Sequence, residues 1–322
     1  MKNILVTGAA GQIGSELIPA LRAKYGTDNV IAGLNRTPLS SKVSNAGLSV
    51  KVDITNISDI EKAVDNFEID YIFHMSTFLS ALAENNPQGA FGVNIAGLTN
   101  VLDVAVDKKL EGVMVPSSIA VFGSGIPTED TPNDVMLKPT TLYGIAKVYG
   151  ELLGNYYFQR YGLDVRGLRL PGIVSCMDEM PTNGTTDYAV QIFYGAVQDS
   201  SYTCFLKPDT RLPMVYMPDA VKALIDLAEC HTDKLVHRTD FNVTAMSFTP
   251  SDLAQEIRKK IPNFVISYDI DTLRQSIADS WPSSLDDSAA RLEWAWHPDY
   301  DITSMVDEML SLVSQQLNSR PI

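Results

Sequence analysis

The feature that most constrains the fold of this chain is a regular alternation of short apolar runs with longer amphipathic stretches. The short runs are rich in β-branched residues, as buried strands are, and the stretches between them have helical periodicity. Such an alternation indicates an α/β fold with a parallel, doubly wound sheet and right-handed crossovers. The predicted strands are residues 3–7, 29–34, 48–52, 71–74, 112–116 and 164–170. The predicted helices between them are residues 13–24, 58–66, 87–107 and 143–161.

Three glycines follow the first predicted strand, in the sequence Gly-Ala-Ala-Gly-Gln-Ile-Gly at residues 8–14. Gly8 and Gly11 allow a tight turn and a close approach of the backbone to a pyrophosphate, and Gly14 lets the next helix pack against the strand. The N-terminus of that helix offers free N–H groups to the phosphates. An ordinary glycine-rich turn is the alternative. The position after the first strand of an alternating chain favours a Rossmann fold that binds a dinucleotide.

The end of the second predicted strand bears on the choice between NAD and NADP. An acidic residue there hydrogen-bonds the ribose of NAD, and an arginine accommodates the 2′-phosphate of NADP. Here Leu34 occupies the position of the acidic residue. Asn35 can still bond a ribose hydroxyl, and Arg36 either meets a phosphate or is a solvated turn residue, so NADP stays open beside NAD. Asp53 and Ile54, after the third strand, either flank the adenine or form a turn or helix cap.

A candidate catalytic set follows from Tyr143 and Lys147, which lie four residues apart on one face of a predicted helix. A tyrosine titrates near a pKa of about 10, too high for a base at neutral pH. A nearby ammonium and a positive nicotinamide ring lower that pKa, so Tyr143 takes a hydroxyl proton while hydride leaves the same carbon. Lys147 also holds the nicotinamide ribose. Ser118, after the fifth strand, hydrogen-bonds the substrate oxygen.

The composition narrows the partners and the site chemistry. The net charge of −14 disfavours binding to nucleic acid and to anionic membranes. Three cysteines and four histidines are scattered along the chain without the spacing of a metal site, so we expect reduced thiols and no metal. No signal peptide is recognisable and no apolar run approaches the length of a membrane span, which predicts a cytoplasmic protein.

Together these motifs resemble the extended short-chain dehydrogenase/reductase family over nearly the full length of the chain. The matching segments are residues 8–14, 116–123, 143–147 and 168–172. Within that family the chain is most similar to the metal-independent L-threonine 3-dehydrogenases, at residues 184–190, 212–220, 245–250 and 277–282. The resemblance implies oxidation of the β-hydroxyl of L-threonine by NAD, giving 2-amino-3-oxobutyrate. It also implies a homodimer built on the predicted helices 87–107 and 143–161.

Substrate recognition is expected after residue 170, where the alternation of predicted strands and helices ends. Residues 171–186 are rich in Pro, Gly, Thr and Asn, which suits a long loop over a cleft. Thr185 and Thr186 precede a predicted helix at 187–198, where they either cradle the substrate carboxylate or cap the helix. Ser80 faces the same crevice or is an ordinary loop hydroxyl. Trp281 closes over the substrate or lies in a core or an interface.

The remaining predictions divide the chain into two parts. A dinucleotide-binding Rossmann domain covers residues 1–170, with residues 211–243 returning to it, and a smaller substrate-binding domain covers 171–210 and 244–322. A capping box at residues 249–252 starts one helix of that smaller domain. The predicted cofactor contacts are Gly8, Gly11, Gln12, Ile13, Asn35, Arg36, Asp53, Ile54, Met75, Ser76, Tyr143, Lys147 and Pro171. The predicted substrate contacts are Ser80, Ser118, Tyr143, Thr185, Thr186 and Trp281.

Two other functions stay open. A nucleotide-sugar epimerase or dehydratase shares the fold and the Ser–Tyr–Lys set, and Arg211 lies where those enzymes often have a diphosphate-binding arginine. A dinucleotide-sensing binding protein that has lost its chemistry is the non-enzymatic alternative. Such a protein usually lacks the tyrosine or the lysine, and this chain has both.

Overall fold

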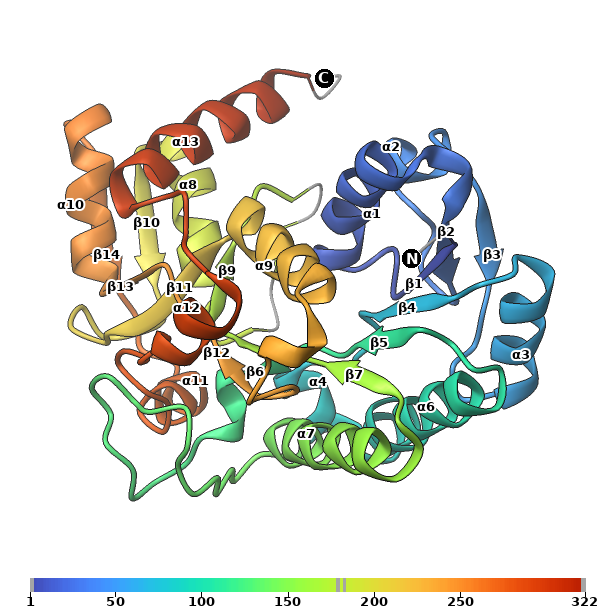
Figure 1. Cartoon of the computed structure of the whole chain (residues 1–322). Coiled ribbons are helices and arrows are strands. Elements are labelled where there is room, and N and C mark those ends of the chain that lie inside the picture. Colours follow the sequence, from blue (N-terminus) through green and yellow to red (C-terminus); the bar gives the residue numbers. More distant parts are fainter. Residues whose placement is uncertain (1–2, 178–179, 182–183, 320–322) are drawn as a thin grey trace.

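The computed structural model describes residues 3–177, 180–181 and 184–319 (Figure 1). Its largest sheet has six strands in the order β3-β2-β1-β4-β5-β7, and every neighbouring pair is parallel. The strand order reverses between β1 and β4, where parallel sheets open a ligand crevice at their carboxyl ends. This sheet confirms the predicted doubly wound α/β fold. The strands are β1 (Ile4–Thr7), β2 (Val30–Leu34), β3 (Ser49–Lys51), β4 (Tyr71–His74), β5 (Gly112–Met114) and β7 (Asp164–Arg166).

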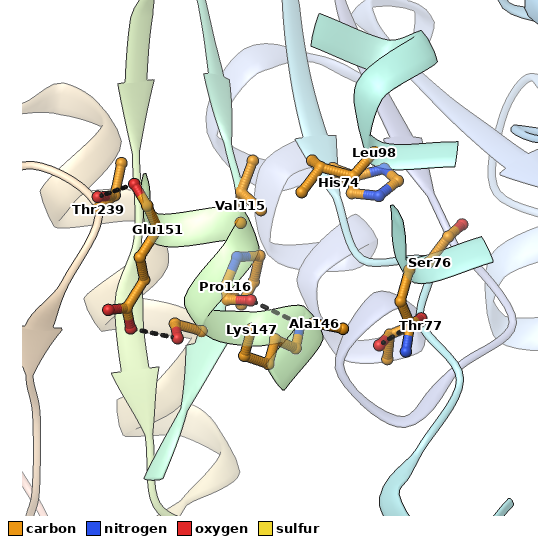
Figure 2. A pocket seen from close by; sticks show the side chains of 13 residues that line it. His74, Ser76, Thr77, Leu98, Val115, Pro116, Ala146, Lys147, Glu151 and Thr239 are labelled. Atoms are coloured by element: carbon orange, nitrogen blue, oxygen red, sulfur yellow. Dashed lines mark hydrogen bonds between the residues drawn. The ribbon is translucent and has the colours of Figure 1, made fainter. Parts of the chain in front are cut away.

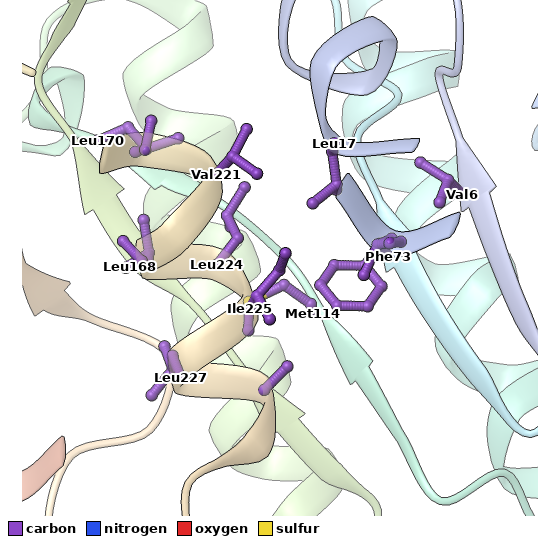
Figure 3. Close-up of a cluster of buried hydrophobic side chains, with 14 of the residues drawn as sticks. Val6, Leu17, Phe73, Met114, Leu168, Leu170, Val221, Leu224, Ile225 and Leu227 are labelled. Atoms are coloured by element: carbon purple, nitrogen blue, oxygen red, sulfur yellow. The ribbon is translucent and has the colours of Figure 1, made fainter. Parts of the chain in front are cut away.

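Helices cover both faces of this sheet (Figure 1). One face carries α1 (Gln12–Tyr25), α2 (Ser41–Ser44) and α9 (Met217–Glu229), and the other carries α3 (Ile57–Asn66), α6 (Leu98–Asp107) and α7 (Leu142–Tyr161). Figure 3 shows apolar side chains of α9 facing those of α1 and the sheet, among them Leu224, Leu17 and Phe73. Full burial of each such side chain contributes roughly 1.5–3 kcal/mol. The late helix α9 therefore completes the core that begins with the first strand.

The predicted helix 87–107 forms, but it is not uniform. It consists of α5 (Pro87–Ala90), a π-helical segment η2 (Phe91–Gly97) and α6. By length and hydropathy alone this stretch could cross a membrane, which corrects the expectation that no run approaches that length. In the structure it packs on the sheet, with Val101 and Leu102 fully buried. Buried core helices also meet these length and hydropathy criteria, and the packing identifies this stretch as a core helix.

The predicted strand 164–170 is wrong as a single strand. The chain forms β7, turns at Gly167, and continues as β8 (Leu168–Leu170) in a different sheet with β6 (Ser117–Ser118) and β12 (Phe241–Asn242). A side-chain carbon on Gly167 would lie only 2.4 Å from the carbonyl oxygen of Val115. The glycine therefore lets the backbone cross closely between two sheets, a close approach that the apolar pattern could not reveal.

A second apolar core lies in the C-terminal half. It is built on α8 (Tyr188–Asp199), α10 (Pro250–Lys260) and α13 (Ile302–Ser319). The predicted capping box of α10 is confirmed, because Thr249 and Asp252 exchange side-chain to backbone hydrogen bonds of 3.0 Å in both directions. The other strands are β9 (Gly172–Val174), β10 (Ser201–Cys204), β11 (Leu212–Tyr216), β13 (Met246–Phe248) and β14 (Val265–Tyr268). The other helices are α4 (Ser80–Asn85), α11 (Thr272–Ala278), α12 (Ser288–Trp294), η1 (Thr27–Asn29), η3 (Ile119–Val121) and η4 (Thr232–Lys234).

Candidate active site

The glycine loop connects β1 to α1 at the switch point of the sheet. Gly8 has φ +67°, and a side-chain carbon there would lie 2.7 Å from the backbone nitrogen of Ser76. A side-chain carbon on Gly14 would lie 2.4 Å from the carbonyl oxygen of Gly8. The glycines thus bring Met75 and Ser76, two predicted cofactor contacts, directly against the loop.

The N-terminus of α1 fits an anionic ligand. The helix begins after Gly11, and within the described part of the chain no side chain caps its first turn. That turn also contains no acidic residue. Its orphan N–H groups and the positive end of the helix dipole are suited to phosphate groups. The residues present therefore fit a dinucleotide diphosphate.

Gln12, a predicted cofactor contact, has a protein partner in this structure. Its side-chain amide donates to Ser175 Oγ at 2.7 Å, and it lies 3.5 Å from the carbonyl oxygen of Ile173. Ser175 follows β9 directly and is buried. The contact therefore joins the first turn of α1 to the segment that leads into the second core.

Leu34, at the end of β2, occupies the position where an acidic residue was expected. The structure places another carboxylate, that of Asp53, beside the neighbouring residue Asn35. Asp53 Oδ1 accepts hydrogen bonds from the Thr55 hydroxyl at 2.7 Å and the Thr55 backbone at 3.0 Å. The Thr55 hydroxyl first of all, and then Asn35 and the charge of Arg36, lower the pKa of Asp53. Asp53 therefore stays ionised beside Asn35, where a ribose hydroxyl would be a suitable donor. The predicted contact Ile54 instead buries its side chain in the core.

The segment after β4 is held by polar side chains that the sequence did not single out. Thr7 Oγ1 lies 2.9 Å from His74 Nδ1 and 3.4 Å from the backbone nitrogen of Ser76. Burial, with a smaller contribution from the charge of Lys147, lowers the pKa of His74 to about 3, so this imidazole is neutral at physiological pH. The predicted substrate contact Ser80 is the first residue of α4 and is buried.

Asn94, in the π-helical segment, fixes the same loop from the opposite side. Its amide oxygen accepts from the backbone nitrogen of Phe78 at 2.7 Å, and its amide nitrogen donates to the Phe78 carbonyl at 3.0 Å. Its amide oxygen also lies 3.2 Å from Thr77 Oγ1. π-Helical turns are frequent at functional sites. An asparagine inside a long apolar stretch was the one signal in the sequence that could have found this residue.

The three predicted catalytic residues meet at one place in the fold. Tyr143 and Lys147 lie in the first turns of α7, and the Lys147 nitrogen is 5.5 Å from the centre of the Tyr143 ring. Lys147 donates to the carbonyl oxygen of Pro116 at 2.8 Å, as Figure 2 shows. Ser118, two residues further along, lies near enough to Tyr143 for its hydroxyl to lower the pKa of the phenol. Pro171 is buried at the end of β8, whose last residue pairs with Ser118.

In the protein without a cofactor, burial is the main influence on the pKa values of Tyr143 and Lys147. Burial raises the pKa of Tyr143 to about 12, against the lowering effect of its hydrogen bond to Ser118. Burial lowers the pKa of Lys147 to about 8, against the opposing charge of Glu151. Desolvation therefore dominates the pKa of Tyr143, and the lowering contribution comes from Ser118 instead of the expected ammonium of Lys147. A further positive charge is needed to make Tyr143 a base near neutral pH.

The predicted substrate residues lie where the second core meets this crevice. Thr185 is buried, and Thr186 contacts Gly172 closely, since a side-chain carbon on that glycine would lie 2.8 Å from Thr186 Cγ2. Both precede α8, whose N-cap is Asp187. Trp281 is half-buried and packs against both the second core and the apolar cluster after Ser118. The arrangement thus places Trp281 between the second core and the cluster after Ser118, and Thr186 against the first residue of β9.

Over residues 3–177, 180–181 and 184–319, no group of three or more His, Cys, Asp or Glu side chains could hold a metal ion. What the described residues do provide is a phosphate-binding helix terminus beside a tyrosine, a lysine and a serine.

Comparison with known proteins places this site in a family. Residues 4–244 match the model of the NAD-dependent epimerase/dehydratase family. The mitochondrial L-threonine 3-dehydrogenase of Bos taurus is 46% identical over 96% of this chain and 82% of its own length. The X-ray structure of L-threonine dehydrogenase from Clostridium difficile has a TM-score of 0.95 and 45% identity, with 98% of each chain covered. UDP-glucose 4-epimerase from Thermotoga maritima shares the fold, with a TM-score of 0.84 and 20% identity. The match covers 99% of this chain and 100% of that one.

These matches confirm the family resemblance predicted from the motifs. The match to the family model begins at the first residue of β1 and spans the glycine loop, Ser118, Tyr143 and Lys147. The chain belongs to the NAD-dependent epimerase/dehydratase family, and its cofactor is NAD.

Proposed function

We propose that this protein is an L-threonine 3-dehydrogenase, which transfers hydride from the β-carbon of L-threonine to NAD. The observation that carries the proposal is the meeting of Ser118, Tyr143 and Lys147 beside the glycine loop. It occurs in a chain that matches L-threonine 3-dehydrogenases along nearly its whole length. The reaction converts the secondary alcohol of threonine to a ketone, giving 2-amino-3-oxobutyrate, reduced cofactor and one proton.

Each residue of the set has a distinct part in this step. The Tyr143 oxygen takes the hydroxyl proton as the β-carbon loses hydride and its C–O bond becomes a carbonyl. Ser118 donates a hydrogen bond to the same oxygen and disperses the charge that develops there. Lys147, held by the Pro116 carbonyl, would hold the nicotinamide ribose through its ammonium group. The bound NAD supplies the hydride acceptor and a positive ring, whose charge adds to that of Lys147 in favouring the Tyr143 phenolate.

We further propose that Thr185 and Thr186 recognise the carboxylate of threonine. They stand just before Asp187, the N-cap of α8, where the positive end of the helix dipole favours an anion. Asp187 holds this turn in shape, because its Oδ2 accepts from the backbone nitrogen of Gly184 at 2.7 Å. A threonine hydroxyl in such a turn is therefore preorganised for a charge-assisted hydrogen bond.

Replacing Thr186 with Ala should raise KM for L-threonine by about 10- to 100-fold, since a hydrogen bond to a charged group contributes about 1.5–3 kcal/mol. The turnover number and the melting temperature should change little, because the side chain is half-buried and the hydroxyl is remote from the reacting carbon. Steady-state kinetics with varied threonine check this. Thr186→Ser, which keeps the hydroxyl, is the matched control and should retain the original KM. An unchanged KM in Thr186→Ala would exclude the residue from the substrate site.

Assay of the purified protein separates this function from its main rival. With L-threonine and NAD we expect a continuous increase in reduced-nicotinamide absorbance, and with UDP-glucose we expect no product. A nucleotide-sugar epimerase would interconvert the sugar nucleotide without a net change in the cofactor. Arg211, the candidate diphosphate contact of such an enzyme, faces Asp252 at 3.9 Å on the surface of the protein. Interconversion of a sugar nucleotide without oxidation of threonine would overturn the proposal.

The homodimer and the cytoplasmic location stay predictions. Support for the dimer comes from the helices on which it is expected, because they carry large exposed apolar side chains. Phe91 is 47% exposed, and Leu152 on α7 is 66% exposed. Exposed apolar side chains of this size on adjacent helices are typical of an interaction surface.

A further inference from the structure

A buried ion pair lies one helical turn beyond Lys147. Glu151 and Arg169 form a bidentate pair, with Nε donating to Oε1 at 2.9 Å and Nη2 donating to Oε2 at 2.8 Å. Their side chains are only 4% and 3% exposed. A buried ion pair is costly to desolvate and by itself is weak evidence of stabilisation. The position of this pair beside the catalytic lysine therefore calls for a functional explanation.

The Glu151 carboxylate connects the elements that carry the catalytic set. It accepts a hydrogen bond from Ser117 Oγ at 2.5 Å, and Ser117 immediately precedes Ser118 (Figure 2). Through Arg169 it is also joined to β8, which ends beside Pro171. One carboxylate thus joins the helix of Tyr143 and Lys147 to the strand of Ser118 and to the strand that leads to the predicted cofactor contact Pro171.

Glu151 and Lys147 line the same small cavity. Lys147, Glu151, Ser117 and Asn94 are among the residues that line this cavity, whose volume of about 20 Å³ has room for a water molecule. The other titratable groups near Lys147 are His74 on β4, which is neutral, and Tyr143 on α7.

Glu151 is the anion whose charge raises the pKa of Lys147. Arg169 on β8 pairs with Glu151, and an oxygen of Asp240 lies 4.0 Å from the same Arg169 nitrogen, Nη2. Burial raises the pKa of Glu151, and the hydrogen bonds and charge of Arg169 and the hydrogen bond of Ser117 oppose that rise. Arg169 and Ser117 both donate to the Glu151 oxygens, which is the hydrogen-bonding environment of an ionised carboxylate.

We propose that Glu151 is a positioning residue of this active site, whose carboxylate, held by Arg169 and Ser117, keeps the Lys147 ammonium charged and aligned with Ser118 and the cofactor. The inference rests on the proposed dehydrogenase function for its effect on turnover. Its effect on cofactor binding requires only that Lys147 contacts NAD. These two consequences can therefore be tested separately.

The sign of the expected pH effect follows from the charge of Lys147. Burial lowers the pKa of Lys147 to about 8, and the carboxylate of Glu151 opposes that lowering. Lys147 therefore loses its charge as the pH rises through about 8, and it does so at a lower pH when the carboxylate is removed. Activity and NAD affinity should fall with that loss on the alkaline side.

The test compares Glu151→Gln and Glu151→Asp with the natural protein between about pH 6 and pH 10, by kcat/KM and by NAD affinity from fluorescence quenching. In Glu151→Gln we expect the alkaline fall of both quantities to begin about one pH unit lower, with near-normal values at the acid end. Glu151→Asp, which keeps the charge, should restore most of the alkaline activity. Glu293→Gln is the matched control, because Glu293, on α12, pairs with His237 outside the site. This substitution should leave both profiles unchanged.

A second variant covers the case in which Glu151→Gln fails to fold. Ser117→Ala leaves the ion pair intact and removes only one restraint on the carboxylate, so we expect a smaller shift in the same direction. A uniform loss at all pH values in these variants, with the alkaline fall unmoved, would show a purely structural role and overturn the inference. A shifted NAD-binding profile in a protein that does not oxidise threonine would support the role of Glu151 while rejecting the dehydrogenase proposal.

Discussion

Replacing Tyr143 with Phe should lower kcat for threonine oxidation by about 100- to 10,000-fold, because general-base catalysis contributes on that scale. The substitution removes one buried oxygen and keeps the ring. NAD affinity should therefore stay close to that of the natural protein, since Lys147 and the glycine loop remain in place. Steady-state turnover and fluorescence titration with NAD measure the two quantities on the same sample.

Tyr149→Phe provides the matched control on the same helix. Tyr149 lies 2.8 Å from Thr99 Oγ1, so its loss also removes a partly buried hydroxyl and a hydrogen bond. Its hydroxyl bonds Thr99 on α6 and takes no part in the contacts of Ser118 or Lys147, so turnover should stay near normal. Near-normal turnover in Tyr143→Phe would refute the role of this phenol as the base. A loss of similar size in both variants would point to damage to α7 instead.

Replacing Gly8 with Ala should weaken NAD binding by about 100-fold or more, and this is the second large effect that we expect. Two causes add. The residue has φ +67°, which costs a residue with a side chain about 1–2 kcal/mol. The new carbon would also lie 2.7 Å from the backbone carbon of Met75, so the loop and the β4 end must separate. Calorimetric titration with NAD measures the effect directly.

Gly162→Ala separates backbone strain from steric displacement. Gly162 has φ +73°, close to that of Gly8, but a side-chain carbon there meets no atom within 4 Å among the residues that the structure describes. This variant should lose stability by a comparable backbone cost and bind NAD normally. If Gly8→Ala binds NAD as well as Gly162→Ala does, the loop does not form the pyrophosphate site.

Much of the site was predictable because its signals are local. The glycine loop is a contiguous segment between a strand and a helix, and the spacing of Tyr143 and Lys147 is a single turn of helix. Parallel strands bring their carboxyl ends to one edge of the sheet, so Ser118 could be expected near the loop without knowledge of any long-range contact. The fold class followed from the same alternation of strands and helices.

What the sequence could not provide depends on contacts between distant segments. Glu151 and Arg169 are unremarkable in sequence, and only folding brings them together with Ser117. The division of the strand at Gly167 depends on how closely another backbone passes it. The raised pKa of Tyr143 reflects burial, which the spacing of two side chains on a helix does not reveal.

Transfer of isotope from substrate to cofactor tests the central claim most directly. The protein is incubated with NAD and L-threonine that carries deuterium at the β-carbon, and the reduced cofactor is analysed by mass spectrometry and NMR. Our account predicts one deuterium at C4 of the nicotinamide ring in each molecule of reduced cofactor, and transfer that is about 100-fold or more slower with Tyr143→Phe. Reduced cofactor without deuterium, or an absence of reduced cofactor with the natural protein, would contradict it.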